Sequence, residues 1–85
     1  MKITDFDYSY LKSALLEVKD KIPDHIKFLN QPENLAKIKD FDTRLRWDWF
    51  TAAMRGRTSF LNKMYDYLDD SHIDTALKKI IKEIQ

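Results

Sequence analysis

Arginine and tryptophan side chains gather in one short stretch of the chain, residues 40–57. This stretch holds all four arginines and both tryptophans of the 85-residue sequence. A guanidinium group donates paired hydrogen bonds to carboxylates and phosphates, and a tryptophan ring supplies a large contact area, so both residue types are enriched at interfaces. The stretch therefore predicts a protein-binding surface. With one further tyrosine, its candidate residues are Arg44, Arg46, Trp47, Arg55, Arg57 and Tyr67.

A protein partner is favoured over a nucleic acid as the ligand of these residues. The formal net charge is only +1 and is spread nearly evenly along the chain, whereas nucleic-acid-binding domains carry clustered basic charge. Arg55-Gly56-Arg57 resembles the turn of a helix-turn-helix, but the segment that follows, residues 58–68, contains one lysine, one aspartate and no arginine. Acidic residues lie within one helical turn of Arg44 and Arg46, so we expect these arginines to pair inside the protein.

Two histidines are the only candidates for acid–base catalysis. His25 follows Asp24, and His72 lies between Asp70 and Asp74. A carboxylate can orient an imidazole, but adjacent positions of a helix do not face each other. The sequence also lacks a serine nucleophile elbow, a glycine-rich phosphate loop and paired zinc-ligand histidines. It therefore predicts a non-enzymatic protein without a cofactor.

One acidic cluster has the residue types of a metal site. Its members lie close together in the sequence and are Asp66, Asp69, Asp70, His72 and Asp74. A calcium loop needs ligands at alternating positions, a central glycine and a closing glutamate, and this segment has none of these. Acidic residues near the start of a helix explain the cluster as helix caps, so no metal site is predicted.

Helices are expected to position all these side chains. One glycine and two prolines give the chain few residues for tight hairpins, and 85 residues suffice for one core. We expect an all-α protein, a compact bundle of four main helices plus one or two short connecting helices, forming one domain over residues 1–85.

The sequence also bears on where the protein works. The absence of cysteine excludes disulfides and is typical of a reducing compartment. The charged first seven residues do not resemble a signal peptide, and no apolar run reaches membrane-spanning length. We therefore expect a cytoplasmic protein that does not bind a membrane.

Spacing and capping residues place the main helices at about 4–22, 42–55, 58–68 and 71–84. Thr4 is expected to cap the first helix, and Pro23 to end it and open a short helix; a second short turn is expected over 32–38. Thr58 and Ser71 are expected to cap the last two helices.

The second main helix is expected to be surrounded by the others, because apolar side chains cover most of its circumference. Two apolar rows run along it: Phe41, Leu45, Trp49 and Ala52 or Ala53, and Trp47, Phe50 and Met54. We expect Trp49 to be buried and Trp47 to lie at the edge of the core. The remaining polar stripe consists of Arg44, Asp48, Thr51 and Arg55, and Asp48 can reach Arg44 one turn before it. The expected N-cap is Asp40 or Asp42, and the expected left-handed C-cap is Gly56.

The other helices are each expected to bury one apolar face, with Asp5 and Asp7 near the positive end of the first helix. The predicted buried residues recur at steps of three or four. They are Phe6, Tyr10, Leu11, Ala14, Leu15, Val18 and Ile22; Ile26 with Leu29 or Phe28; Leu35 and Ile38; Phe60, Leu61, Met64, Tyr65 and Leu68; and Ile73, Ala76, Leu77, Ile80, Ile81 and Ile84.

Two segments of the chain resemble those of a group of small helical proteins encoded by bacteriophages and prophages. The first is Arg44-Leu45-Arg46-Trp47-Asp48, and the second runs from Asp69 to Lys78 and contains His72-Ile73-Asp74-Thr75-Ala76-Leu77. The resemblance covers about residues 40–81 and differs in having Ser71 between Asp70 and His72. It implies an accessory protein that binds a host protein, with inhibitors of CRISPR and other defence systems as a prominent class.

Three functions are therefore expected in decreasing order. The first is a non-enzymatic protein-binding module, encoded by a phage, that inhibits a host defence complex in the manner of an anti-CRISPR protein. The second is a small DNA-binding regulator. The third is a self-assembling structural or accessory phage protein, which would form a concentration-dependent oligomer.

Overall fold

The computed structural model describes residues 3–84, and over that range its regular secondary structure is entirely helical. The elements are α1 (Asp5–Glu17), a 3₁₀ turn η1 (Lys19–Lys21), α2 (Ile22–Leu29), α3 (Pro32–Leu35), α4 (Phe41–Met54), α5 (Thr58–Tyr67) and α6 (Asp70–Ile84). The predicted all-α bundle is confirmed, with two short helices between α1 and α4. No helix within this range is long and apolar enough to cross a bilayer.

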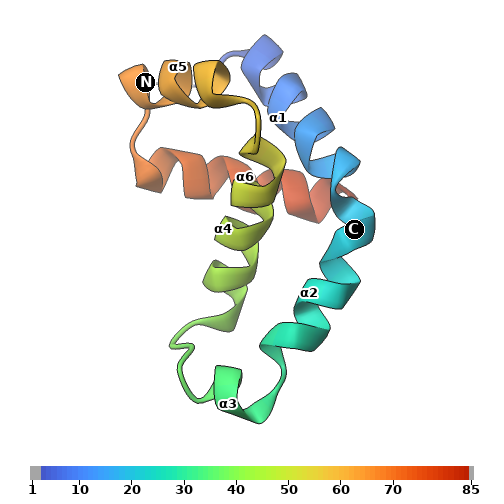
Figure 1. Ribbon diagram of the computed structural model, residues 1–85. Helices are drawn as coiled ribbons and strands as arrows, with labels where there is room; N and C mark the ends of the chain where they lie inside the picture. The colour runs from blue at the N-terminus through green and yellow to red at the C-terminus, as the bar shows by residue number, and fades with distance from the viewer. Residues whose placement is uncertain (1–2, 85) are drawn as a thin grey trace.

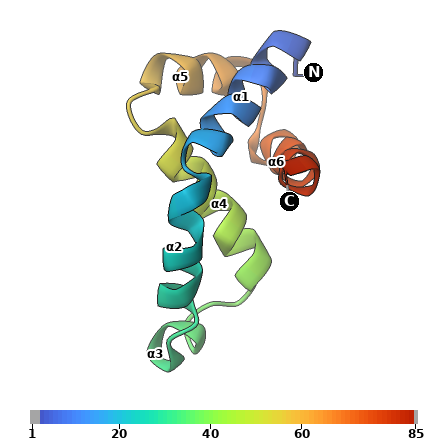
Figure 2. The same ribbon diagram turned by 90° about the vertical axis from the view of Figure 1, so that its right-hand side faces the viewer.

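Helix α4 connects the two ends of an elongated molecule that measures 39 Å by 24 Å by 24 Å. In Figure 1, α1, α5 and α6 gather at the C-terminal end of α4, and α2 and α3 extend beside its N-terminal half. Figure 2 shows α4 running between α2 and α6. Helix α4 therefore lies at the centre of the fold, but one of its long sides is uncovered, so the prediction that the other helices surround it is wrong.

The core forms where α1, α4, α5 and α6 meet. Its most deeply buried apolar side chains include Leu11, Leu15, Met64, Ile73, Leu77 and Ile80. Trp49 is 4% exposed, and its indole Nε1 donates a 2.9 Å hydrogen bond to the backbone carbonyl of Leu15. Trp47 is only partly buried, as predicted. Burial of these side chains supplies the main stabilising term of the fold.

The first helix is shorter than predicted, since α1 ends at Glu17 and the expected end at 22 is wrong. Val18 leaves helical geometry with φ −104° and ψ 5°, and the chain passes through η1 into α2. The last carbonyl groups of a helix lack partners within it. The carbonyl of Leu15 accepts a 3.3 Å hydrogen bond from the N–H of Val18 and a second one from Trp49 of α4, so a contact between helices supports the end of α1. Pro23 lies in the first turn of α2, as expected.

Asp7 takes a buried position that the sequence pattern had assigned to aromatic neighbours. Its carboxylate is 1% exposed and faces α5, whereas Phe6 is 72% exposed and Tyr10 37% exposed. Successive helical residues point about 100° apart, so a buried Asp7 turns Phe6 outward. The prediction that Phe6 and Tyr10 belong to the core is therefore wrong, and Asp7 does more than complement the helix dipole.

The cap of α6 is also different from the prediction. Asp69, and not Ser71, precedes the helix: its carboxylate accepts a 3.0 Å hydrogen bond from the backbone N–H of His72, and its carbonyl accepts one from Ile73. The helix begins one residue before Ser71 because Asp69 sits in the capping position. Thr4 and Asp40 cap α1 and α4 as predicted, through hydrogen bonds of 3.1 Å each.

We expect Asp69→Ala to lower the midpoint of thermal unfolding, because an N–H in the first turn of α6 loses its acceptor. Ser71→Ala should leave the midpoint unchanged, since the backbone carbonyl of Ser71, which accepts a hydrogen bond from Thr75, remains. Circular dichroism melts of the two variants provide the comparison. A larger loss for Ser71→Ala would place the helix start where the sequence had placed it.

Three other details depart from the predictions. Gly56 adopts φ 80°, as expected. The turn after α4 is short: the backbone N–H of Arg57 donates a hydrogen bond to the carbonyl of Met54, and Arg57 occupies the N-cap position of α5. Thr58 is therefore the first helical residue and not the cap. The second short turn is helical only over Pro32–Leu35. Leu35 and Tyr65, which were expected to be buried, are each 43% exposed.

Candidate functional site

The six candidate residues fall into two groups, one on the uncovered side of α4 and one engaged in contacts between helices. Arg44, Trp47 and Arg55 line its uncovered side, whereas Arg46, Arg57 and Tyr67 make contacts within the protein. The helical repeat explains the division, because positions 44, 47, 51 and 55 recur at steps of three and four. We call Arg44, Trp47, Thr51 and Arg55 the α4 outer face.

Arg46 joins α4 to α6. Its guanidinium group donates to the carboxylate of Asp74, with Nε 3.0 Å from Oδ1, and to the hydroxyl of Thr43. The side chain is only 15% exposed. Although burial acts to raise it, the hydrogen bonds and charge of Arg46 hold the pKa of Asp74 below its ordinary value. Charge reversal of Arg46 would therefore disturb the fold as well as any outside contact.

Arg57 and Tyr67 join α5 to α1. Arg57 donates to the carboxylate of Glu17 and, over 2.9 Å, to the carbonyl of Ala53. The hydrogen bond from Arg57 to Glu17 raises the pKa of the guanidinium group. Tyr67 donates its hydroxyl hydrogen bond to buried Asp7. These two candidates thus stabilise the α1–α5 contact, a role that sequence spacing could not reveal because their partners lie 40 and 60 residues away.

A groove lies on one flank of the α4 outer face, between α4 and α2. It encloses about 400 Å³, and Val18, Ile22 and Ala52 supply its apolar lining. We call it the basic groove, because its charged lining residues are Lys21, His25, Arg44, Asp48 and Arg55.

One carboxylate organises part of the basic groove. Asp48 Oδ2 lies 2.8 Å from Nε of Arg44 and 2.8 Å from Nε2 of His25. The Arg44–Asp48 pair confirms the prediction from four-residue spacing. The contact between Asp48 and His25 was not predicted, because the two residues lie 23 positions apart and Asp24 was the only carboxylate near His25 in the sequence. Lys21 and Arg55 form no ion pair within residues 3–84.

An aromatic hollow lies on the other flank of the α4 outer face, toward α5. It also encloses about 400 Å³ and is lined by Trp47, Phe50, Met54, Leu61 and Tyr65 together with polar neighbours that include Thr51 and Arg55. The Trp47 and Phe50 rings meet edge to face with centroids 5.4 Å apart, an arrangement that holds the tryptophan in place. Thr51 and Arg55 line both cavities, so the two form one continuous surface.

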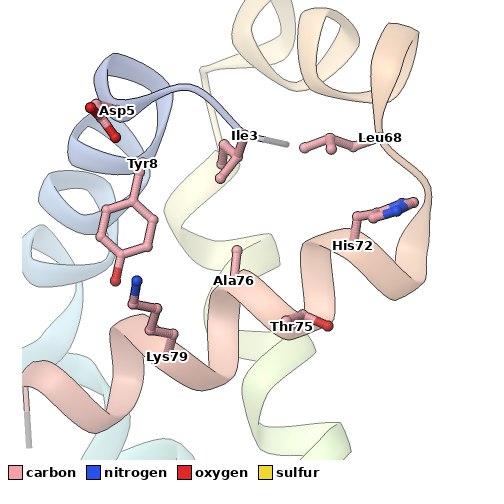
Figure 3. Close-up of a pocket in the computed structure, with 8 residues that line it drawn as sticks. All are labelled: Ile3, Asp5, Tyr8, Leu68, His72, Thr75, Ala76 and Lys79. Carbon is pink, nitrogen blue, oxygen red and sulfur yellow. The ribbon is translucent and has the colours of Figure 1, made fainter. Parts of the chain in front are cut away.

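A separate pocket of about 580 Å³ lies between the start of α1 and the start of α6. Figure 3 shows Ile3, Leu68 and Ala76 pointing toward its middle. Asp5 and Lys79 give its rim charges of both signs. Lys79 also lies over the ring of Tyr8, with Nζ 5.2 Å from the centroid. The pocket offers apolar surface, but the charge around it favours no particular ligand.

The acidic cluster near α6 serves the helix itself. Asp69 caps α6 and also contacts Nδ1 of His72 at 2.8 Å, while Asp74 binds Arg46 and Lys78. Within residues 3–84, no group of three or more histidine and acidic side chains is arranged to hold a metal ion.

Comparisons of the chain with protein-family models, with curated proteins and with solved structures find no match. The α4 outer face with its two flanking cavities is therefore the candidate site on geometric grounds alone.

Proposed function

We propose that the protein is a non-enzymatic protein-binding module and that the α4 outer face is its contact surface. The observation that carries the proposal is the continuous surface on which Trp47 and Tyr65 adjoin Arg44 and Arg55. Tryptophan, tyrosine and arginine are the residue types on which interface energies concentrate, especially beside pockets that accept a partner's side chain. The aromatic hollow, at about 400 Å³, is large enough to accept an apolar side chain of a partner.

A protein fits this surface better than a DNA duplex does. A recognition helix must protrude to enter the major groove, which is about 12 Å wide. Helix α4 is flanked by α2 along one side, and α5 packs near its C-terminal end (Figures 1 and 2). Asp48 also places a negative charge among the arginines, where it would face phosphates. Both features favour a partner with protruding side chains.

The resemblance to phage accessory proteins supports a host protein as the partner. On this proposal, binding covers a surface that a host defence complex needs, as anti-CRISPR proteins do, and the protein requires no chemistry of its own. Arg46, Arg57 and Tyr67 then contribute by keeping α4, α5 and α6 in place.

Capture from a lysate of the bacterial host, with the full chain immobilised, tests the proposal. We expect the native protein and Lys82→Glu to retain the same host complex, because Lys82 lies on the α6 side of α4. The double variant Tyr65→Ser/Arg55→Glu should lose it, since both side chains are exposed parts of the surface. If this double variant is folded and still captures the complex, the surface is wrong. If the native protein captures no host protein, the function is wrong.

A plating assay addresses the defence system directly. Expression of the native protein in a strain with active CRISPR immunity should raise the plating efficiency of a targeted phage, and the double variant should not. Unchanged plating in the presence of the native protein would contradict inhibition of that system.

A further inference from the structure

We infer that the basic groove binds an acidic segment of the partner protein, so that the partner presents carboxylates along α4 and an apolar side chain to the aromatic hollow. This inference rests on the proposed function and adds the chemistry of the partner. It is carried by the composition of the groove: Lys21, Arg44 and Arg55 against a single carboxylate, Asp48.

Both arginines of the groove are exposed, and Asp48 orients one of them, Arg44. Asp48 accepts a hydrogen bond from Nε of Arg44, and the Arg44 side chain is still 57% exposed and open to a ligand. Arg55 and Lys21 are exposed and lack a carboxylate partner within residues 3–84. By contrast, Arg46 and Arg57 have side chains 15% and 23% exposed and are already paired. Of the four arginines, the two with exposed side chains therefore both line the basic groove.

The spacing of the two exposed arginines sets the length of the acidic segment. Arg44 and Arg55 lie three helical turns apart, about 16 Å at a rise of 1.5 Å per residue. An extended peptide covers that distance with about five residues. Carboxylates at the two ends of such a segment would each form a charge-assisted hydrogen bond with a guanidinium group. The apolar lining at Val18, Ile22 and Ala52 accommodates the aliphatic parts of the acidic side chains.

A titration with hexaglutamate tests the inference without knowledge of the natural partner. Two-dimensional NMR of the full chain at about 0.01 M salt should show saturable shifts at the amides of Thr51, Ala52 and Arg55 and at the Nε–H of Arg44. Because the Debye length falls from about 30 Å to about 3 Å, the shifts should disappear at about 1 M salt. Hexaglutamine should produce none of them, and equal shifts with this neutral peptide would overturn the inference.

Matched charge reversals locate the effect. Lys21→Glu/Arg55→Glu should weaken hexaglutamate binding by at least about tenfold, since two attractive charges become repulsive. Lys82→Glu/Lys27→Glu carries the same change in net charge outside the groove and should stay within about twofold of the native protein. Equal weakening by both double variants would show an effect of net charge and would overturn the assignment to the groove.

Two further results separate this inference from the proposed function. A DNA duplex of about 20 base pairs that displaces hexaglutamate and shifts the same amides more strongly would overturn the inference in favour of a nucleic acid. Capture of a host complex that needs Tyr65 but tolerates Lys21→Glu/Arg55→Glu would leave the proposed function standing and remove the acidic partner. Hexaglutamate binding without capture of any host protein would contradict the proposed function and leave only the preference of the groove for acidic peptides.

Discussion

Trp49→Ala is expected to lower the free energy of unfolding by about 3 to 5 kcal/mol, the range for removing a large buried aromatic side chain. The ring is 4% exposed and lies where α1 and α4 meet, so alanine would leave a cavity at the centre of the core. The substitution would also remove the hydrogen bond from Nε1 to the carbonyl of Leu15, at the point where α1 ends early. Urea denaturation followed by circular dichroism measures the loss.

Two further variants separate packing from hydrogen bonding at this position. Trp47→Ala should cost less than Trp49→Ala, because the Trp47 ring is only partly buried. Trp49→Phe retains much of the apolar contact and loses the hydrogen bond to Leu15, so a smaller loss of about 1 to 3 kcal/mol is expected. Equal losses for Trp47→Ala and Trp49→Ala would mean that the buried and open sides of α4 have been confused.

Tyr67→Phe is expected to lower the free energy of unfolding by about 1 to 3 kcal/mol at about pH 7, because the buried carboxylate of Asp7 loses a hydrogen-bond donor. The Tyr67 hydroxyl holds the pKa of Asp7 below its ordinary value, helped by Lys63, whose Nζ lies 3.3 Å away, and opposed by burial. A lowered pKa in the folded state stabilises the protein above the unfolded pKa. That stabilisation is lost as the pH falls through the folded value.

The effect of Tyr67→Phe should therefore depend on pH at both extremes. On the acid side, the difference between native protein and variant should shrink once Asp7 is protonated. On the alkaline side, burial and the hydrogen bond to Asp7 raise the pKa of Tyr67 to about 12. Because this pKa is raised in the folded state, Tyr67 stabilises the protein fully below the unfolded pKa of about 10, and this stabilisation is lost as the pH rises from about 10 to 12. Phenylalanine does not ionise, so Tyr67→Phe should not show this loss of stability at alkaline pH.

Denaturation curves at about pH 3, 7 and 11 give the comparison. Tyr10→Phe is the matched control, because Tyr10 is 37% exposed and does not bind Asp7. Removing its hydroxyl group leaves the hydrogen bond between Tyr67 and Asp7 in place. A pH-independent difference between the native protein and Tyr67→Phe would contradict the link between Tyr67 and the charge of Asp7.

Local patterns in the sequence were sufficient for much of the fold. The four main helices, the caps at Thr4 and Asp40, the left-handed Gly56 and the Arg44–Asp48 pair all depend on residues within one or two turns of each other. Interactions of that range are determined by the helical repeat and by the backbone preferences of each residue type. Composition and periodicity therefore determined the helical class and the order of the helices.

Only the tertiary structure decided which polar side chains face inward. Asp7 is buried because Tyr67 and Lys63 of α5 donate hydrogen bonds to its carboxylate. The Arg46 side chain is mostly buried because its guanidinium group binds the carboxylate of Asp74 on α6. Each contact joins residues at least 28 positions apart, beyond the reach of any helical pattern. A burial pattern read from one helix takes charged residues as exposed, since burial of a charge is costly unless a distant partner compensates.

The candidate site shows the same division. From the sequence alone it was clear that the arginines and tryptophans lie within residues 40–57 and that Arg44, Thr51 and Arg55 share one stripe of a helix. In the folded protein, Arg46, Arg57 and Tyr67 form contacts with α1 and α6, and the stripe stays exposed. Lys21 of η1 and His25 of α2 lie beside it. Helical periodicity determines which side chains share a face. Which face stays open to a partner depends on where the other helices pack, and that follows from contacts between residues far apart in the chain.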